Sequence, residues 1–293
     1  MAELGTTLNG QQPGVQPDVQ PGGRQPAEQP ADRQPGGQPA AVYQVKGRRP
    51  VNGRHRPAPA SRQPSVLIAT RHGESTANVE FQLAEAAGAL SVPISCRDAD
   101  IPLSMNGRRQ AQALGHWWAG LPAADRPRSV WCSPYVRTAE TARIALAQAA
   151  GLGAVPISLA VRYDERLRDR ELGILEMLPR AAIEAQHPQE ADRRRKMGEL
   201  YYRPPGGESW SDVALRVRSC LRDLREEEDG NPVLLVAHDC TVLMLRYALD
   251  RLTEQQLLEL EQVRNCSTSV WRAADGRLRR ERWNAIEHLS ADG

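Results

Sequence analysis

The chain has 293 residues and a formal net charge of +2, with half of its 22 prolines before Ser65 and all six tryptophans after it. A proline-rich stretch without tryptophan buries little apolar area, so we expect a disordered tail over residues 1–64 and one folded domain over residues 65–290. The basic charge is concentrated in the tail and the domain is nearly neutral. This argues against nucleic-acid binding, because that function needs a concentrated basic face.

The tail is marked by the pair Gln-Pro, which recurs seven times between Gln12 and Pro39. Proline fixes φ and removes backbone donors, while Gln and Gly add no core, so this Pro/Gln/Gly-rich segment is predicted to stay disordered. A proline-binding module could recognise this segment. No PxxP core with a well-placed arginine stands out, so a passive tail is favoured. The basic stretch Lys46–Arg62 could contact a polyanion, although such runs are more often solvated.

The spacing of the cysteines and the hydropathy of the chain indicate in which cellular compartment the protein is expected. Five cysteines are scattered along the chain without a CxxC pair, which predicts neither disulfides nor a zinc site and favours a reducing environment. No apolar run approaches the roughly 18 residues that span a bilayer, and the first residues lack the basic and apolar regions of a signal peptide. We therefore expect a soluble, cytoplasmic protein without membrane contact, and the oligomeric state stays open.

The predicted elements begin after Pro64. Short apolar runs predict buried strands at Val66–Thr70, Val130–Cys132 and Val233–Ala237. Helices are predicted from an N-cap at Ser104 to about Ala119, over Tyr135–Ala150, and from Trp210 onward. A hairpin turn is predicted at Asp275-Gly276, between Ser269–Arg272 and Arg277–Arg282.

Strands that alternate with helices indicate an α/β fold, specifically a three-layer α/β/α sandwich with a mostly parallel central sheet. In such sheets, ligands bind beyond the carboxyl ends of the strands. The pairs Arg71-His72, Ser133-Pro134 and His238-Asp239 directly follow the three predicted strands. Chemistry is therefore expected at that edge of the sheet.

The first strand runs into Arg71-His72-Gly73-Glu74-Ser75, and Asn78 follows closely. A neutral imidazole nitrogen can attack phosphorus when the phosphate oxygens are held and neutralised, and arginine supplies paired planar donors for that purpose. An adjacent guanidinium lowers the pKa of His72 from its usual value of about 6.5 and keeps the ring nucleophilic. Asn78 would add a neutral donor. Alone, an Arg-His-Gly triplet is common and favours a structural histidine.

Arg137 follows the second strand at the start of a helix, where the helix N-terminus already favours an anion. The string from Cys132 to Arg137 resembles a cysteine phosphatase loop, but it has four residues between Cys and Arg where that loop needs five. Cys132 is therefore a poor candidate nucleophile. The pattern favours Arg137 as a second phosphate-binding guanidinium.

His238, at the end of the late strand, would be a second donor to phosphate oxygens beside His72. The pair His238-Asp239 could instead form half of a metal site that recruits His72 and Glu74, but metal phosphohydrolases show more clustered ligands. A proton donor for the leaving group is expected in the acidic stretch from Asp164 to Gly173, which could also be no more than a solvated charge run. Burial or the bound phosphate would have to raise the pKa of one of its carboxyls.

In this order, the residues resemble the histidine phosphatase superfamily, which includes the cofactor-dependent phosphoglycerate mutases. The resemblance covers about Ser65 to Leu249. It is carried by the following motifs: Arg71-His72-Gly73-Glu74-Ser75 with Asn78, Ile101-Pro102-Leu103-Ser104 with Gly107 and Gln110-Ala111, Ser133-Pro134 with Arg137-Thr138 and Glu140-Thr141-Ala142, Leu167 to Gly173, Gly206-Gly207-Glu208-Ser209, and His238.

The resemblance implies a phosphomonoester hydrolase in which His72 becomes phosphorylated, with Arg71, Asn78, Arg137 and His238 around the phosphate. It also implies that no metal or organic cofactor is required and that the substrate is a small phosphorylated molecule. Asp169 stands where the family has its proton-donating carboxylate. Many relatives have Glu there, so Glu165 is the reserve candidate, and Glu208 is expected to orient its neighbours.

One further departure from the family pattern and two alternative functions stay open. The residue after the second histidine is usually Gly in this branch of the family. Here it is Asp239, and the acid phosphatase branch also has Asp at this position. A bisphosphoglycerate-dependent mutase would share these residues, but the basic segment Arg193–Lys196 lacks the tryptophan that accompanies it in true mutases. An inactive phosphate-binding scaffold is the third reading. The segment from Leu178 to Pro205 is expected to cap the site and set selectivity.

Overall fold

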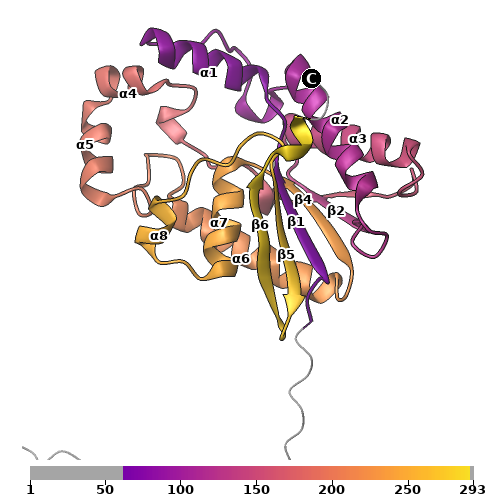
Figure 1. Ribbon diagram of the computed structural model, residues 1–293. Coiled ribbons are helices and arrows are strands. Elements are labelled where there is room, and N and C mark those ends of the chain that lie inside the picture. Colours follow the sequence, from indigo (N-terminus) through magenta and orange to yellow (C-terminus); the bar gives the residue numbers. More distant parts are fainter. Residues whose placement is uncertain (1–61, 291–293) are drawn as a thin grey trace, which may run out of the picture. The chain divides into compact units, whose positions relative to one another are not determined.

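The computed structural model describes residues 62–290, so the predicted tail, except for its last three residues, lies outside the described residues. The domain is built on one six-stranded sheet with the order β3-β2-β4-β1-β5-β6 (Figure 1). In chain order the strands are β1 (Val66–Arg71), β2 (Ser129–Cys132), β3 (Val161–Tyr163), β4 (Pro232–Ala237), β5 (Thr268–Ala274) and β6 (Arg277–Ala285).

Four neighbouring strands of the sheet are parallel. β1 pairs in parallel with β4, and β2 pairs in parallel with both β4 and β3. β5 is antiparallel to β1 and to β6, so the carboxyl-terminal hairpin makes the sheet mixed. The expectation of a mostly parallel central sheet is thus confirmed, and the carboxyl ends of β1, β2 and β4 meet at one edge.

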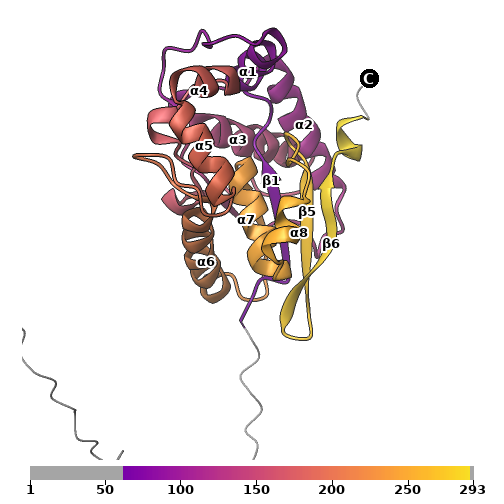
Figure 2. The same cartoon turned by 90° about the vertical axis from the view of Figure 1, so that its left-hand side faces the viewer.

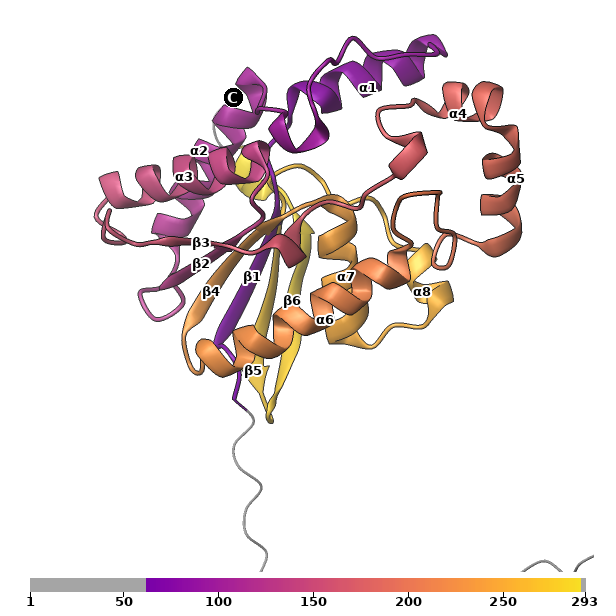
Figure 3. The ribbon, with the colours of Figure 1, turned by 180° about the vertical axis from the view of Figure 1, so that it is seen from behind.

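Helices cover both faces of the sheet. One face carries α2 (Met105–Gly120) and α3 (Val136–Gly151), and the other carries α6 (Trp210–Glu227) and α7 (Asp239–Asp250) (Figure 3). Successive strand residues point to opposite faces, so the apolar run of β1 is buried on both sides. Leu67 and Ala69 pack in the core beneath α6 and α7, whereas Val66 and Ile68 pack in the core beneath α2 and α3. The three-layer α/β/α sandwich is confirmed.

The sequence signals for the predicted helices and the hairpin act as expected. The Ser104 side chain accepts a hydrogen bond from the Gly107 amide at the start of α2, and this satisfies one of the free donors of the first helical turn. In the hairpin, Asp275 and Gly276 have φ values of 48° and 72°. Two positive φ angles are what a two-residue turn with the right twist requires.

The remaining elements lie mainly around the carboxyl edge of the sheet. The helices are α1 (Thr76–Ala87), α4 (Arg180–Gln186), α5 (Pro188–Met197) and α8 (Glu254–Leu258), and the short 3₁₀ helices are η1 (Asp98–Asp100), η2 (Glu165–Leu167), η3 (Gly173–Leu175) and η4 (Glu287–Leu289). α1 and α4 lie close together beyond that edge, with α5 next to them (Figure 2). Within residues 62–290, no helix is long and apolar enough to cross a membrane.

Candidate active site

A cavity of about 370 Å³ lies at the carboxyl edge of the sheet and joins most of the predicted site residues. It is lined by Arg71, His72, Asn78, Arg137 and Asp169. The sixth predicted residue, His238, is fully buried beside them, with its ring centroid 5.2 Å from that of His72. The tertiary structure therefore brings together side chains from β1, α1, α3, the η2–η3 segment and the start of α7.

His72 directly follows β1, and one nitrogen of its ring is hydrogen-bonded to the main chain. Its amide donates to the Ala237 carbonyl at 2.9 Å, which ties the end of β1 to the end of β4. Nδ1 lies 2.7 Å from the Gly73 carbonyl oxygen, an acceptor only, so Nδ1 carries the proton. Burial, with the charges of Arg71 and Arg137 adding to it, keeps the pKa of His72 well below its usual value. Nε2 is therefore an unprotonated nitrogen with a free lone pair.

Gly73 and Gly107 let the loop after β1 lie directly on the start of α2. A Cβ atom on Gly107 would lie 1.9 Å from the Glu74 carbonyl oxygen, and one on Gly73 would lie 2.5 Å from the Gly107 carbonyl oxygen. The Glu74 side chain accepts from Ser104 Oγ at 2.6 Å. It thus supports the loop and does not line the cavity.

Arg71 and Asp239 hold the same residue of the loop that precedes β5. Arg71 Nη1 donates to the Val263 carbonyl at 2.7 Å, and the Asp239 carboxylate accepts from the Val263 amide at 2.9 Å. Burial raises the pKa of Asp239, and the charge of Arg71 opposes that effect. Both side chains also line the cavity, so the residue that departs from the family pattern lies at the site itself.

Arg137, in the first turn of α3, is almost fully buried and bound to two carboxylates. Its Nη2 lies 2.9 Å from Asp98 Oδ2 and 3.1 Å from Asp169 Oδ2, while Nη1 donates to the Asp98 main-chain carbonyl. These anions hold a guanidinium at the cavity that a phosphate dianion could share. Asp98 belongs to η1, and the sequence analysis did not single it out.

Asp169 is the carboxylate at which the cationic groups converge. Its Oδ2 lies 3.3 Å from His238 Nδ1, a close polar contact without the alignment of a full hydrogen bond. Burial raises the pKa of Asp169, but His238, Arg137 and His72 outweigh it and hold the pKa well below the usual value. Glu165, the reserve candidate, is exposed in η2 and does not line the cavity.

His238 is fixed from its other side by a residue at the end of β2. Its Nε2 lies 2.8 Å from Ser133 Oγ, so this hydroxyl determines which way the ring faces. Burial lowers the pKa of His238 although the charge of Asp169 raises it. His72, which lines the cavity, and the fully buried His238 are thus neighbouring imidazoles, each hydrogen-bonded through one ring nitrogen to another residue.

Asn78 is oriented by its own helix and by a residue from far along the chain. Its Oδ1 accepts from the Ser75 amide at 3.0 Å and from Asn265 Nδ2 at 3.1 Å. The same Asn265 nitrogen donates to the His72 carbonyl at 3.0 Å. These bonds leave the Asn78 NH₂ group as the donor for a ligand. No sequence signal marked Asn265, because its role depends on a contact across 187 positions.

Two alternative chemistries can be checked against the geometry. Cys132 is buried at the end of β2, and burial raises the pKa of its thiol to about 12, so the thiolate that a nucleophile requires is not formed near neutral pH. In the part of the chain that the structure describes, no three His, Cys, Asp or Glu side chains gather in a way that could hold a metal ion. All five cysteines lie in this part and are free thiols.

Comparison with known proteins identifies the class. A family model for the histidine phosphatase superfamily (branch 1) matches residues 67–286. A 2,3-bisphosphoglycerate-dependent phosphoglycerate mutase 2 from Gloeobacter violaceus is 31% identical over 199 residues, which are 67% of this chain and 81% of that protein. A 6-phosphofructo-2-kinase/fructose-2,6-bisphosphatase from Gallus gallus is 28% identical over 66% of this chain, but only 34% of that longer protein is matched.

A similar solved structure is that of the mycobacterial glucosyl-3-phosphoglycerate phosphatase in complex with VO₃. It has a TM-score of 0.58 and 28% identity, and the match covers 76% of this chain and all of that one. The chain described here belongs to the histidine phosphatase superfamily, as its motifs suggested. The named relatives include both mutases and phosphatases, so membership by itself does not select the reaction or the substrate.

Proposed function

We propose that the protein is a phosphomonoesterase that transfers the phosphoryl group to His72 and then to water. The observation that carries this proposal is the hydrogen bond between His72 Nδ1 and the Gly73 carbonyl oxygen, at 2.7 Å. The hydrogen bond from Nδ1 to the Gly73 carbonyl leaves Nε2 unprotonated beside Arg71 and Arg137. An imidazole held in this form among fixed cations has what attack on a phosphate requires.

In the first step, His72 Nε2 attacks phosphorus and the bond from phosphorus to the ester oxygen breaks. Arg71, Arg137, Asn78 and His238 hold the phosphoryl oxygens, and positioning with charge stabilisation supplies most of the catalysis in such reactions. The ester oxygen leaves with the proton of Asp169. In the unliganded site Asp169 is ionised, so the incoming phosphate dianion must raise the pKa of this carboxyl before it can donate.

In the second step, water attacks the phosphohistidine and transfers a proton to Asp169, and the bond between His72 Nε2 and phosphorus breaks. The products are the alcohol and inorganic phosphate. This scheme uses no metal ion or organic cofactor and needs only a small phosphorylated substrate. A cytoplasmic location, predicted from composition, stays a prediction.

Phosphate release from an aryl phosphate and from 3-phosphoglycerate in EDTA, by the wild-type protein and by His72→Ala, tests the proposal. We expect turnover that survives EDTA and is lost in the variant, and acid-labile ³²P on the wild-type protein after rapid quenching. Activity retained by His72→Ala, or abolished by EDTA, would show that the nucleophile is assigned wrongly.

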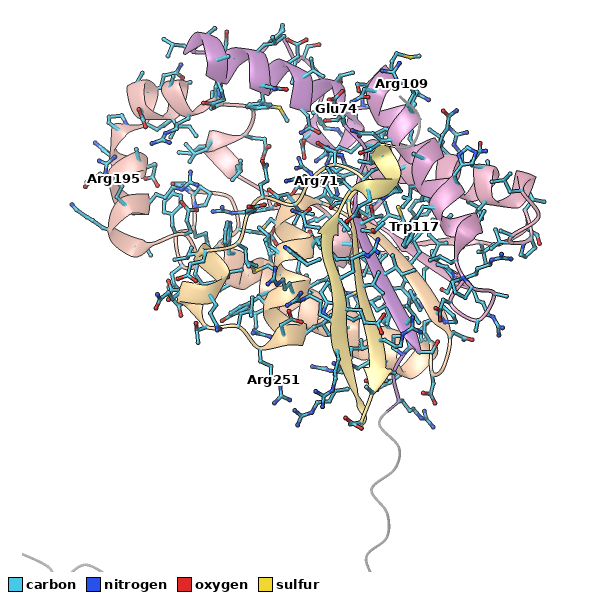
Figure 4. The ribbon with its side chains drawn as sticks, in the orientation of Figure 1. Arg71, Glu74, Arg109, Trp117, Arg195 and Arg251 are labelled. Carbon is cyan, nitrogen blue, oxygen red and sulfur yellow. The ribbon has the colours of Figure 1, made fainter. Side chains whose placement is uncertain are left out.

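A phosphoglycerate mutase is the second candidate, because a named relative carries that activity. The basic segment of α5 argues against it. Arg193 pairs with Glu190, Arg194 with Glu199, and both Arg195 and Lys196 with Asp192. Each of these four cations is thus paired with one of three neighbouring carboxylates, and Arg195 points away from Arg71 (Figure 4). Conversion of 3-phosphoglycerate to 2-phosphoglycerate that depends on a bisphosphate primer would establish the mutase and overturn the hydrolase.

A further inference from the structure

The cavity has a second half whose character differs from the phosphate-binding end. Its wall is formed largely by apolar side chains from α1, from η3 and the segment after it, from α4 and from the start of α6. The main ones are Phe81, Leu175, Met177, Leu178, Ile183 and Trp210. Phe81 is the only phenylalanine of the chain. Contact with an apolar wall next to a phosphate site stabilises binding of the group that is esterified to the phosphate, when that group is apolar.

The charged groups near this wall do not favour a second anion on the substrate. Arg194 is paired with Glu199, and Arg170 donates to the main-chain carbonyls of Glu208 and Tyr202 at 2.7 and 3.2 Å. Glu176 also lines the cavity, where Asp98, Asp169 and Arg137 are the charged groups that act on it, and burial raises the pKa of its carboxyl. A carboxylate or second phosphate on the leaving group would therefore meet Glu176 and would have to displace existing bonds to reach a guanidinium.

Met177 lies in this wall with a backbone conformation that L-residues avoid. Its φ is 59°, one of five positive φ values at non-glycine residues among those described. A side chain in this region is strained where glycine would be free, and such strain persists where the surrounding structure or function requires it. Here the turn carries the Met177 side chain to the cavity, so the strained position and the substrate-facing position are the same residue.

We propose that the cavity selects phosphomonoesters whose leaving group is a neutral apolar ring or branched chain, and that Met177 is a specificity-determining residue for that group. The proposal rests on the phosphatase function proposed above. It adds that carboxylated phosphoesters such as 3-phosphoglycerate are poor substrates. The flexible thioether of Met177 covers the apolar leaving group while the phosphate lies against His72.

Binding of non-hydrolysable phosphonates by calorimetry tests the selectivity without turnover. We expect the wild-type protein to bind benzylphosphonate at least tenfold more tightly than methylphosphonate, and 3-phosphonopropionate no more tightly than methylphosphonate. Met177→Gly should reduce the benzyl-to-methyl ratio about fivefold and leave the affinity for methylphosphonate unchanged. Met177→Leu, which restores an apolar side chain, should keep most of the ratio.

Arg251→Gly is the matched control. Arg251 ends α7 with a φ of 55° and does not line the cavity. It lies well below Arg71 in the view of Figure 4. Glycine relieves the same kind of backbone strain at both positions, so both variants should keep or raise the melting temperature. Only Met177→Gly should change the ratio of phosphonate affinities.

The outcomes separate the two proposals. Benzylphosphonate that binds no better than the other phosphonates, or an equal change of ratio in both glycine variants, overturns the inference. Tightest binding of 3-phosphonopropionate, lost in Arg170→Gln, also overturns it and assigns the cavity to an anionic substrate. If benzylphosphonate is preferred but no phosphomonoester is hydrolysed, the selective cavity stands and the phosphatase function fails.

Discussion

Arg216, in α6, donates through Nη2 to the main-chain carbonyl of Asp169 at 2.9 Å, and its Nη1 bonds to the carbonyls of Arg166 and Arg168 at 2.7 and 2.9 Å. Glu208 accepts from Arg216 Nε at 2.9 Å and from Arg168 Nη2 at 2.8 Å. One guanidinium thus binds three carbonyl groups, those of Arg166, Arg168 and Asp169, in the segment that carries Asp169. Glu208 orients its neighbours, as the sequence analysis expected, and does so through this arginine.

Replacement of Arg216 by Ala should displace Asp169 without removing it. We expect the free energy of unfolding to fall by about 2–4 kcal/mol, because three part-buried carbonyls each lose a donor and Glu208 loses one of its two arginine partners. We also expect kcat to fall by about 10- to 100-fold, since a displacement of about 1 Å has such effects. Urea unfolding and steady-state kinetics measure both. Arg203→Ala removes an exposed arginine that pairs with Asp212 and should change stability by no more than about 0.5 kcal/mol; equal losses in both variants would contradict the role of Arg216.

Asp169→Asn should separate the proposed proton donor from the reserve candidate. An amide cannot protonate the leaving oxygen, so kcat/KM for an alkyl phosphate should fall by about 10²- to 10⁴-fold. The loss should be much smaller for 4-nitrophenyl phosphate, whose leaving group departs without a proton. Glu165→Gln, at an exposed position of η2, should stay within about twofold of wild type. A large loss in Glu165→Gln with little in Asp169→Asn would reverse the assignment.

Asp98 forms an ion pair with Arg137 in the unliganded site. Its negative charge therefore lies where a phosphate dianion must bind. Asp98→Asn should therefore strengthen inhibition by inorganic phosphate by about 3- to 10-fold, the effect of removing one nearby like charge at the effective dielectric of a protein surface. Asp100, on the same short helix η1, is exposed and paired with Arg97. Asp100→Asn should leave the inhibition constant unchanged. Inhibition that does not change in Asp98→Asn would mean that this carboxylate moves away before the phosphate binds.

The buried histidines should make stability depend on pH below neutrality. The pKa values of His72 and His238 in the folded state lie below their ordinary value. Between the folded and unfolded pKa values the unfolded chain binds more protons, so the free energy of unfolding falls as pH drops below about 6.5, by up to about 1.4 kcal/mol per pH unit for each histidine. Urea unfolding from pH 7.5 to 5 should give a shallower pH slope for His72→Gln. His116→Gln, at an exposed site, should keep the wild-type slope, and the same slope in all three proteins would refute the linkage.

The sequence carried most of the information on the elements. β1, β2 and β4 coincide within a residue with the predicted apolar runs, and the helices after Ser104 and from Trp210 begin where expected. β3 was missed because it has only three residues, two of them exposed. The antiparallel pairing of β5 with β1 was also not foreseen, because the pairing partner of a hairpin is not encoded in its own turn. α4 and α5 fill the segment that was expected to cover the site, and Ile183 and Tyr202 from this segment line the cavity.

The sequence by itself determined the positions of β1, β2 and β4, the starts of the main helices and the reactive residue types that follow those strands, since hydrophobic period, capping residues and motif order are local properties of the chain. Tertiary structure decided which carboxylate faces the cavity, Asp169 or Glu165, and which ring nitrogen of His72 is unprotonated. It also placed Asn265 and Arg216 behind the site and turned Met177 toward its apolar wall. These features depend on distances between residues far apart in the chain and on their shared burial, which no single stretch of sequence specifies.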